Sequence, residues 1–122
     1  MEKGLSYTST LRVDEAHTAR TMGSGDMPVL ATPALVALME NAAMKAVADV
    51  LPEGSTSVGA LIEISHVKPS GVGEQVRATA ELMEIEGRKL TFTLRAEDSK
   101  GEVGHGRHVR YIVDRQRFLA KL

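Results

Sequence analysis

The chain has 122 residues and a formal net charge of −1, from 15 basic and 16 acidic side chains. This length predicts one domain over residues 1–122, with enough chain to bury a core. The balanced charge and the scarcity of aromatic residues argue against a nucleic-acid-binding protein, which needs a basic surface or stacking platforms. Without cysteine, the chain has no disulfide, no thiolate nucleophile and no cysteine-based metal site.

No apolar leader opens the chain, and no stretch is apolar enough to predict a membrane span. Together with the lack of cysteine, this leads us to expect a cytoplasmic protein that does not bind membranes.

The first half of the chain predicts a strand, a long connection and a helix. Residues 5–13 are rich in strand-forming types. Residues 14–31 form a connection of a length that is often functional in compact domains. The apolar run 33–51 predicts one long helix, because Thr32 is a good N-cap, Pro33 suits the first helical position, and a Pro-Glu-Gly sequence follows the run.

The second half predicts four strands from alternating apolar residues and the turns between them: residues 57–68, 75–86, 89–97 and 102–113. A short amphipathic piece is expected at 115–122. The order favours an α+β domain in which an antiparallel sheet of about five strands covers one long helix. Such a sheet leaves an edge and an apolar flank exposed, so we expect at least a homodimer.

Glu40 is the most informative residue of the predicted helix. At about 100° per residue, the polar side chains of the run fall in one stripe, and Glu40 lies on the opposite, apolar side. An unpaired buried carboxylate is costly, so we expect it to find a partner or to hold its proton. Buried carboxylates of this kind often mark active sites.

His66 is the expected partner of Glu40. It continues an alternating series that should face the helix, formed by Val58, Ala60, Ile62 and Ile64. A buried Glu and a buried His would satisfy each other. The alternatives are a purely structural pair, or a histidine that turns to solvent at the end of its strand.

Thr32 is the third candidate. It either serves only as the N-cap of the helix, or places a hydroxyl beside free backbone N–H groups that can stabilise an oxyanion. Thr32 and Glu40 are eight residues apart, about 12 Å along a helix axis. His66, a water molecule or a substrate carbonyl would have to lie between them.

Five short segments carry a family resemblance: Ala31-Thr32, Leu38-Met39-Glu40, Ser65-His66-Val67, Glu86-Gly87-Arg88 and Gly106 to Arg110. With the spacings from Thr32 to Glu40 and from Glu40 to His66, they resemble the fluoroacetyl-CoA thioesterase-like family of the hotdog fold over nearly the whole chain. The resemblance implies a sheet wrapped around one central helix. It also implies hydrolysis of a small acyl-CoA thioester to a carboxylic acid and CoA.

The same resemblance implies roles for individual residues. Thr32, Glu40 and His66 would be catalytic, and Gly59 and Arg110 would bind substrate. No metal or cofactor is implied beyond the CoA of the substrate, and the site would lie at a dimer contact. The family's fluoroacetate-specific enzyme has aromatic residues before its threonine, whereas residues 22–28 have none here. The resemblance therefore extends to thioester hydrolysis and not to selectivity for fluoroacetyl-CoA.

Several alternatives remain open at this point. Thr32 could attack the thioester with His66 as base, Glu40 and His66 could activate a water molecule, or Glu40 could attack directly through an anhydride. A non-catalytic acyl-CoA or acyl-carrier binding protein would keep the same pocket, and a hydratase is a third possibility. His105 and His108 are three apart on a predicted strand and face opposite sides, which is poor metal-ligand geometry.

Overall fold

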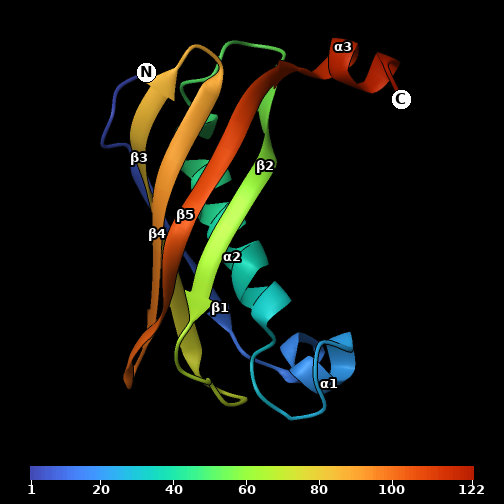
Figure 1. The fold of residues 1–122 in the computed structure, drawn as a ribbon, viewed down its shortest axis with the longest axis vertical. Helices are drawn as coiled ribbons and strands as arrows, with labels where there is room; N and C mark the ends of the chain where they lie inside the picture. Colours follow the sequence, from blue (N-terminus) through green and yellow to red (C-terminus); the bar gives the residue numbers. More distant parts are fainter.

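The computed structural model describes all of residues 1–122 and has a single antiparallel sheet with one long helix against it (Figure 1). The strands follow the order β1-β3-β4-β5-β2 across the sheet. Their bounds are β1 Ser6–Arg12, β2 Ser55–His66, β3 Gln75–Glu86, β4 Lys89–Asp98 and β5 Gly101–Asp114. The long helix α2 spans Thr32–Ala48. The predicted order of strand, helix and four strands is confirmed.

Two parts of the chain differ from expectation. Helix α2 ends at Ala48, before the predicted end at Leu51, and Asp49 is its C-cap. The connection contains a 3₁₀ helix, η1 (Glu15–His17), and one helical turn, α1 (Ala19–Met22). Both are too short for a periodic pattern in the sequence. At the other end of the chain, the short piece expected at 115–122 contains a helix, α3 (Arg115–Ala120).

The core lies between α2 and the central strands. The alternating residues predicted to share one face are buried, namely Val76, Ala78, Ala80 and Leu82 of β3 and Leu90, Phe92 and Leu94 of β4. From the helix, Leu35, Met39 and Val47 pack against them. Each large apolar side chain removed from water in this way contributes about 1.5–3 kcal/mol to folding.

Strand β2 does not keep the simple alternation that its sequence suggests. Its pairing with β5 shifts register between Gly59 and Leu61, so Ala60 sits at a β-bulge. Ile62 and Ile64 pack against the core as predicted. The predicted inward place of Ala60 is wrong, because the extra residue moves Gly59 to the helix-facing side. A Cβ built on Gly59 would lie 3.0 Å from Oε2 of Glu40.

The outer edge of β2 has no neighbouring strand in the sheet (Figure 1). Leu61 and Val67, within and just after this strand, are exposed. A strand of this length with free backbone groups is a template for pairing with another chain.

None of the helices has both the length and the hydropathy needed to cross a lipid bilayer.

Two glycines allow β5 to approach β2 where β2 carries His66. Gly104 pairs with His66, and Gly106 pairs with Ile64. A Cβ on Gly106 would clash with the carbonyl oxygen of Glu63 and would lie 2.8 Å from Cα of Ile64.

We therefore expect Gly106→Ala to lower the free energy of unfolding by about 2 kcal/mol or more, because the strand pair must separate locally. Gly71→Ala is the matched control, since a Cβ there meets nothing within 4 Å, and should change it by less than about 0.5 kcal/mol. Urea denaturation measures both. Equal midpoints for the two variants would contradict this account of the β2–β5 contact.

Candidate active site

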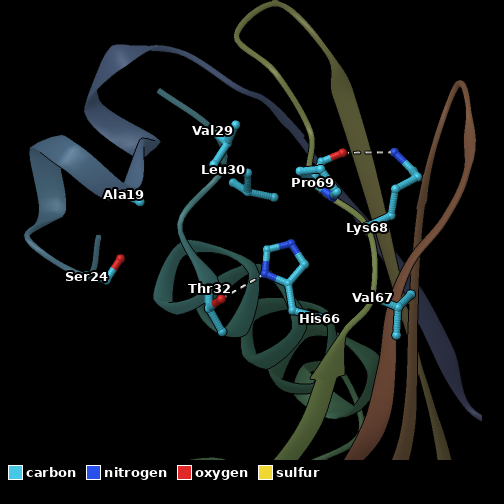
Figure 2. A pocket seen from close by; sticks show the side chains of 9 residues that line it. All are labelled: Ala19, Ser24, Val29, Leu30, Thr32, His66, Val67, Lys68 and Pro69. Atoms are coloured by element: carbon cyan, nitrogen blue, oxygen red, sulfur yellow. Dashed lines mark hydrogen bonds between the residues drawn. The ribbon is translucent and has the colours of Figure 1, made fainter. Parts of the chain in front are cut away.

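Thr32 and His66 form a direct pair at the N-terminus of α2. Oγ1 of Thr32 lies 2.8 Å from Nδ1 of His66 (Figure 2). The N-cap is Ala31, and no side chain caps the helix. The interpretation of Thr32 as the cap is therefore wrong. Thr32 is the first helical residue, and its hydroxyl forms a hydrogen bond with His66 of β2 instead.

The environment of His66 favours its neutral form. Burial lowers the pKa of His66. A hydrogen bond with the Lys68 backbone opposes this shift, and the Lys68 ammonium adds to it, so the pKa lies below its ordinary value. Its Nε2 is buried and has no hydrogen-bond partner in the chain. A neutral imidazole whose Nδ1 accepts from the Thr32 hydroxyl can act as a base toward that hydroxyl, and it then presents an N–H on Nε2.

A cavity of about 310 Å³ lies beside this pair. Its walls come from the long connection, the start of α2 and the end of β2 (Figure 2). Ala19, Ser24 and Leu30 contribute from the connection. The connection expected to be functional from its length thus lines the cavity beside the Thr32–His66 pair.

A buried carboxylate holds the segment that follows His66. Asp98 accepts hydrogen bonds from Nζ of Lys68 at 2.5 Å, from Oγ of Ser70 at 2.7 Å and from the backbone N–H of Lys100 at 2.8 Å. Burial alone raises the pKa of Asp98, but these hydrogen bonds outweigh it and leave the pKa below its ordinary value. Lys68 also lines the cavity, so this anchor fixes one of its walls.

We expect Asp98→Asn to lower the free energy of unfolding by about 2 kcal/mol at pH 7, the contribution of a hydrogen bond to a charged group. Because the folded-state pKa of Asp98 is lowered, its contribution is present above the unfolded-state pKa and is lost as the pH falls through the folded-state value. Urea titrations at pH 7 and at about pH 3 should therefore show the difference from wild type shrinking in acid. A pH-independent difference would contradict this role.

Glu40 belongs to a different cluster. It is half-buried on the side of α2 that faces β2. The position of a Cβ on Gly59, 3.0 Å from Oε2 of Glu40, is also 3.3 Å from Cε1 of His108 and 3.6 Å from Nη1 of Arg110. Only a glycine leaves room for the three side chains to converge on the strand at this point.

The predicted pairing of Glu40 with His66 does not form within one chain. Glu40 lies about two helical turns, roughly 12 Å, beyond Thr32. Gly59, which Glu40 approaches, lies seven residues before His66, or about 20 Å along an extended strand. The helix pattern showed that Glu40 faces away from the polar stripe, but not which part of β2 lies opposite.

Arg110 is buried at this second cluster. Its Nε donates to Oγ of Ser57 at 2.8 Å, its Nη2 donates to the Ser57 carbonyl oxygen at 2.8 Å, and its Nη1 lies 3.1 Å from Nε2 of His108. Burial lowers the pKa of Arg110, and the nearby Glu40 carboxylate opposes this shift. The guanidinium remains charged, with Glu40 as its counter-charge.

The predicted site residues thus fall into two groups in one chain. Thr32 and His66 share the first cavity. Glu40, Gly59 and Arg110 line a second cavity of about 440 Å³ between α2, β2 and β5.

The sequence did not predict where the side chain of His108 lies. Its side chain is buried, with only 1% of the residue exposed. The available signal was its place two residues before Arg110, which puts both side chains on one face of the strand. His105 lies on the opposite, exposed face beside Glu102, as predicted. No group of three or more His, Asp or Glu side chains is placed to hold a metal ion.

Comparison with known proteins decides the family. The sequence profile described as fluoroacetyl-CoA-specific thioesterase matches residues 13–116. The chain belongs to this family. It is also 38% identical over 94 residues to the fluoroacetyl-CoA thioesterase of Streptantibioticus cattleyicolor, over 77% of this chain and 68% of that protein.

Solved structures agree with this family membership. A threonine-to-serine mutant of the fluoroacetyl-CoA thioesterase in complex with acetyl-CoA has a TM-score of 0.94 and 32% identity, over 99% of this chain and 96% of that one. A hypothetical Thermus thermophilus protein of the thioesterase superfamily has a TM-score of 0.90 and 27% identity, over 98% and 88% of the two chains. The resemblance inferred from sequence, the hotdog fold and the thioester hydrolase class are confirmed.

Proposed function

We propose that this protein hydrolyses a small acyl-CoA thioester to a carboxylic acid and CoA as a homodimer. In each site, Thr32 and His66 of one subunit act with Glu40, Gly59 and Arg110 of the partner subunit. The observation that carries this proposal is the division of the family's site residues into two clusters of one chain. Each cluster lines its own cavity, and neither contains a complete set of groups.

The free edge of β2 supplies a geometry that joins the clusters. If two copies of β2 pair in antiparallel fashion about a two-fold axis through Glu63, with Ala60 bulged in each copy, His66 of one subunit lies opposite Gly59 of the partner subunit. Glu40 packs at Gly59 within each chain. One pairing of the sheets therefore completes two equivalent sites and covers the open edge.

The chemistry at the first cluster follows from the neutral imidazole. In one route His66 takes the proton of Thr32, whose Oγ1 bonds to the acyl carbon as the C–S bond breaks, and water later cleaves the Thr32 ester. In the other route His66 takes a proton from a water molecule that attacks the acyl carbon directly. Backbone N–H groups at the start of α2 can stabilise the oxyanion. CoA leaves as a thiolate, and these steps require no additional cofactor.

Glu40 has two possible tasks in this scheme. Its carboxylate can stabilise a protonated His66 or orient the attacking water, or it can attack the thioester itself and form an anhydride. Solvent oxygen incorporated into Glu40 in a single turnover would identify the anhydride, whereas acyl label retained by Thr32→Ser would identify the ester.

The connection bears on the choice of acyl group. Ser24 lines the first cavity, and Met22 and Met27 are exposed. No aromatic side chain of residues 22–28 is available to cover a fluoroacetyl group. We expect the enzyme to accept small acyl groups without preference for fluorine. Thiol release over a panel of acyl-CoA substrates tests this expectation, and tight binding without release would instead favour a non-catalytic acyl-CoA or acyl-carrier binding protein.

His66→Ala and Glu40→Gln should each lower kcat by about 100-fold or more, because each removes a proton-handling or charge-stabilising group. Thiol release from the best substrate of the panel measures the effect. His105→Ala, an exposed histidine on the far face of β5, is the control and should keep wild-type kcat. Near-normal kcat in both His66→Ala and Glu40→Gln would remove these residues from the mechanism.

Mixing the two inactive variants tests whether the site is shared between subunits. In a dimer that joins one His66→Ala chain to one Glu40→Gln chain, the proposed geometry leaves one site complete. Random pairing should therefore restore about a quarter of wild-type activity, because half of the dimers are mixed and each has one intact site of two. Activity no higher than that of the separate variants would place both residues in a single-chain site.

A further inference from the structure

We propose that His108 is a positioning residue for thioester hydrolysis. It acts as a neutral imidazole protonated on Nδ1, and it ties the bulge of β2 to the buried Arg110 so that Gly59 and Arg110 present one surface to Glu40. The catalytic part of this inference rests on the proposed function, whereas its tautomer does not.

The hydrogen bonds of His108 define its tautomer. Arg110 can only donate, so the 3.1 Å contact between its Nη1 and Nε2 of His108 requires an unprotonated Nε2. A neutral imidazole with a free Nε2 carries its proton on Nδ1. Nδ1 lies 2.7 Å from the carbonyl oxygen of Leu61, which accepts that proton.

The second of these bonds lies at the irregular part of β2. Leu61 is the first residue to resume pairing after the bulge at Ala60. His108 is paired with Ile62, and its ring reaches back to the Leu61 carbonyl. The ring therefore fixes the backbone that turns Gly59 toward Glu40.

The surroundings of His108 disfavour a second proton. Burial lowers its pKa, and the Arg110 charge on the same strand lowers it further. The hydrogen bond to the Leu61 carbonyl and the Glu40 carboxylate on α2 oppose the shift without cancelling it. Phe92 of β4 approaches the ring from the core, with the two ring centroids 6.2 Å apart. Protonation of Nε2 would set two donors of like charge against each other and break the contact with Arg110.

This arrangement has a consequence for the acid side of the pH profile. Both His66 and His108 have lowered pKa values, and in the proposed scheme both must be neutral. Activity is therefore fully present above both values and is lost as the pH falls through them. At the acid limit, kcat/KM should fall by about two orders of magnitude per pH unit in the wild type, and by about one when His108 no longer titrates.

Two substitutions separate the two hydrogen bonds. His108→Gln offers an amide oxygen near the place of Nε2 and keeps an acceptor for Arg110, whereas His108→Asn offers an amide N–H near the place of Nδ1 and keeps a donor for Leu61. Each should lower kcat/KM by about 10- to 100-fold through misplacement of the site. Each should also reduce the acid slope to one. His105→Gln and His105→Asn, on the exposed face of the same strand, should change neither property.

Wild-type kcat/KM together with a wild-type acid slope in both His108 variants would overturn the positioning role. Thermal midpoints recorded alongside show whether the variants are folded. If both unfold, the wild type alone decides: an acid slope of one would overturn the role, and a slope of two would support it.

The tautomer can be tested without any activity. Imidazole ¹⁵N–¹H spectra of the full-length wild type, with the His108 signals assigned from the variants, should show a proton on Nδ1, a free Nε2 and titration below the ordinary histidine range. A proton on Nε2, or an ordinary titration, would overturn the inference. If the wild type releases no thiol from any acyl-CoA, the proposed function fails, while these spectra still decide the tautomer.

Discussion

The hydrogen bond between Thr32 and His66 fixes the geometry on which the rest of the site depends. It joins the start of α2 to the end of β2, while the apolar core places the rest of the helix against the sheet. From this junction α2 runs antiparallel to β2 (Figure 1), and Glu40 meets the strand at Gly59. A helix residue two turns away from Thr32 cannot return to His66. The separation of the two clusters is thus a geometric result of the fold.

The second cluster is organised by a buried positive charge. Placing a guanidinium in the interior is costly unless its donors are satisfied and a counter-charge is near. Arg110 meets the first condition through Ser57 and His108, and Glu40 supplies the second. Glu40 lines the second cavity, where a substrate or a partner subunit can reach its carboxylate. In the proposed reaction this cluster contributes Glu40, and the base is His66 of the other cluster.

Much of the fold could be predicted from the sequence. The alternating residues of β3 and β4 have one buried face, and turns rich in glycine and acidic residues separate the strands. The two-residue alternation and the turn residues therefore predict the same strands. The bulge at Ala60 could not be predicted, because one inserted residue in an apolar strand has no side-chain signature. The turns of η1 and α1 are too short for a 3.6-residue period and are held by their surroundings.

The sequence singled out candidate site residues but not their arrangement. Glu40 and His66 stand out because each interrupts an apolar pattern, and Thr32 because it precedes Pro33 at the predicted start of the helix. Their pairing depends on which elements lie opposite, and this is set by the register of β2. The sequence pattern assigned Glu40 to His66 because it contains no information on the distance between strand positions and helix turns. The contacts of His108 could not be predicted, because its ring meets the Leu61 carbonyl and Arg110 only once β2 and β5 are paired.

A crystal structure of the enzyme with CoA most directly tests the central claim that the site is completed by two subunits. The account predicts a dimer formed through the free edge of β2, with the CoA thiol between His66 of one subunit and Glu40 of its partner. In that structure His66 would lie closer to the partner's carboxylate than to that of its own chain. A dimer formed through another face, with β2 left in solvent and the two clusters apart, would contradict it.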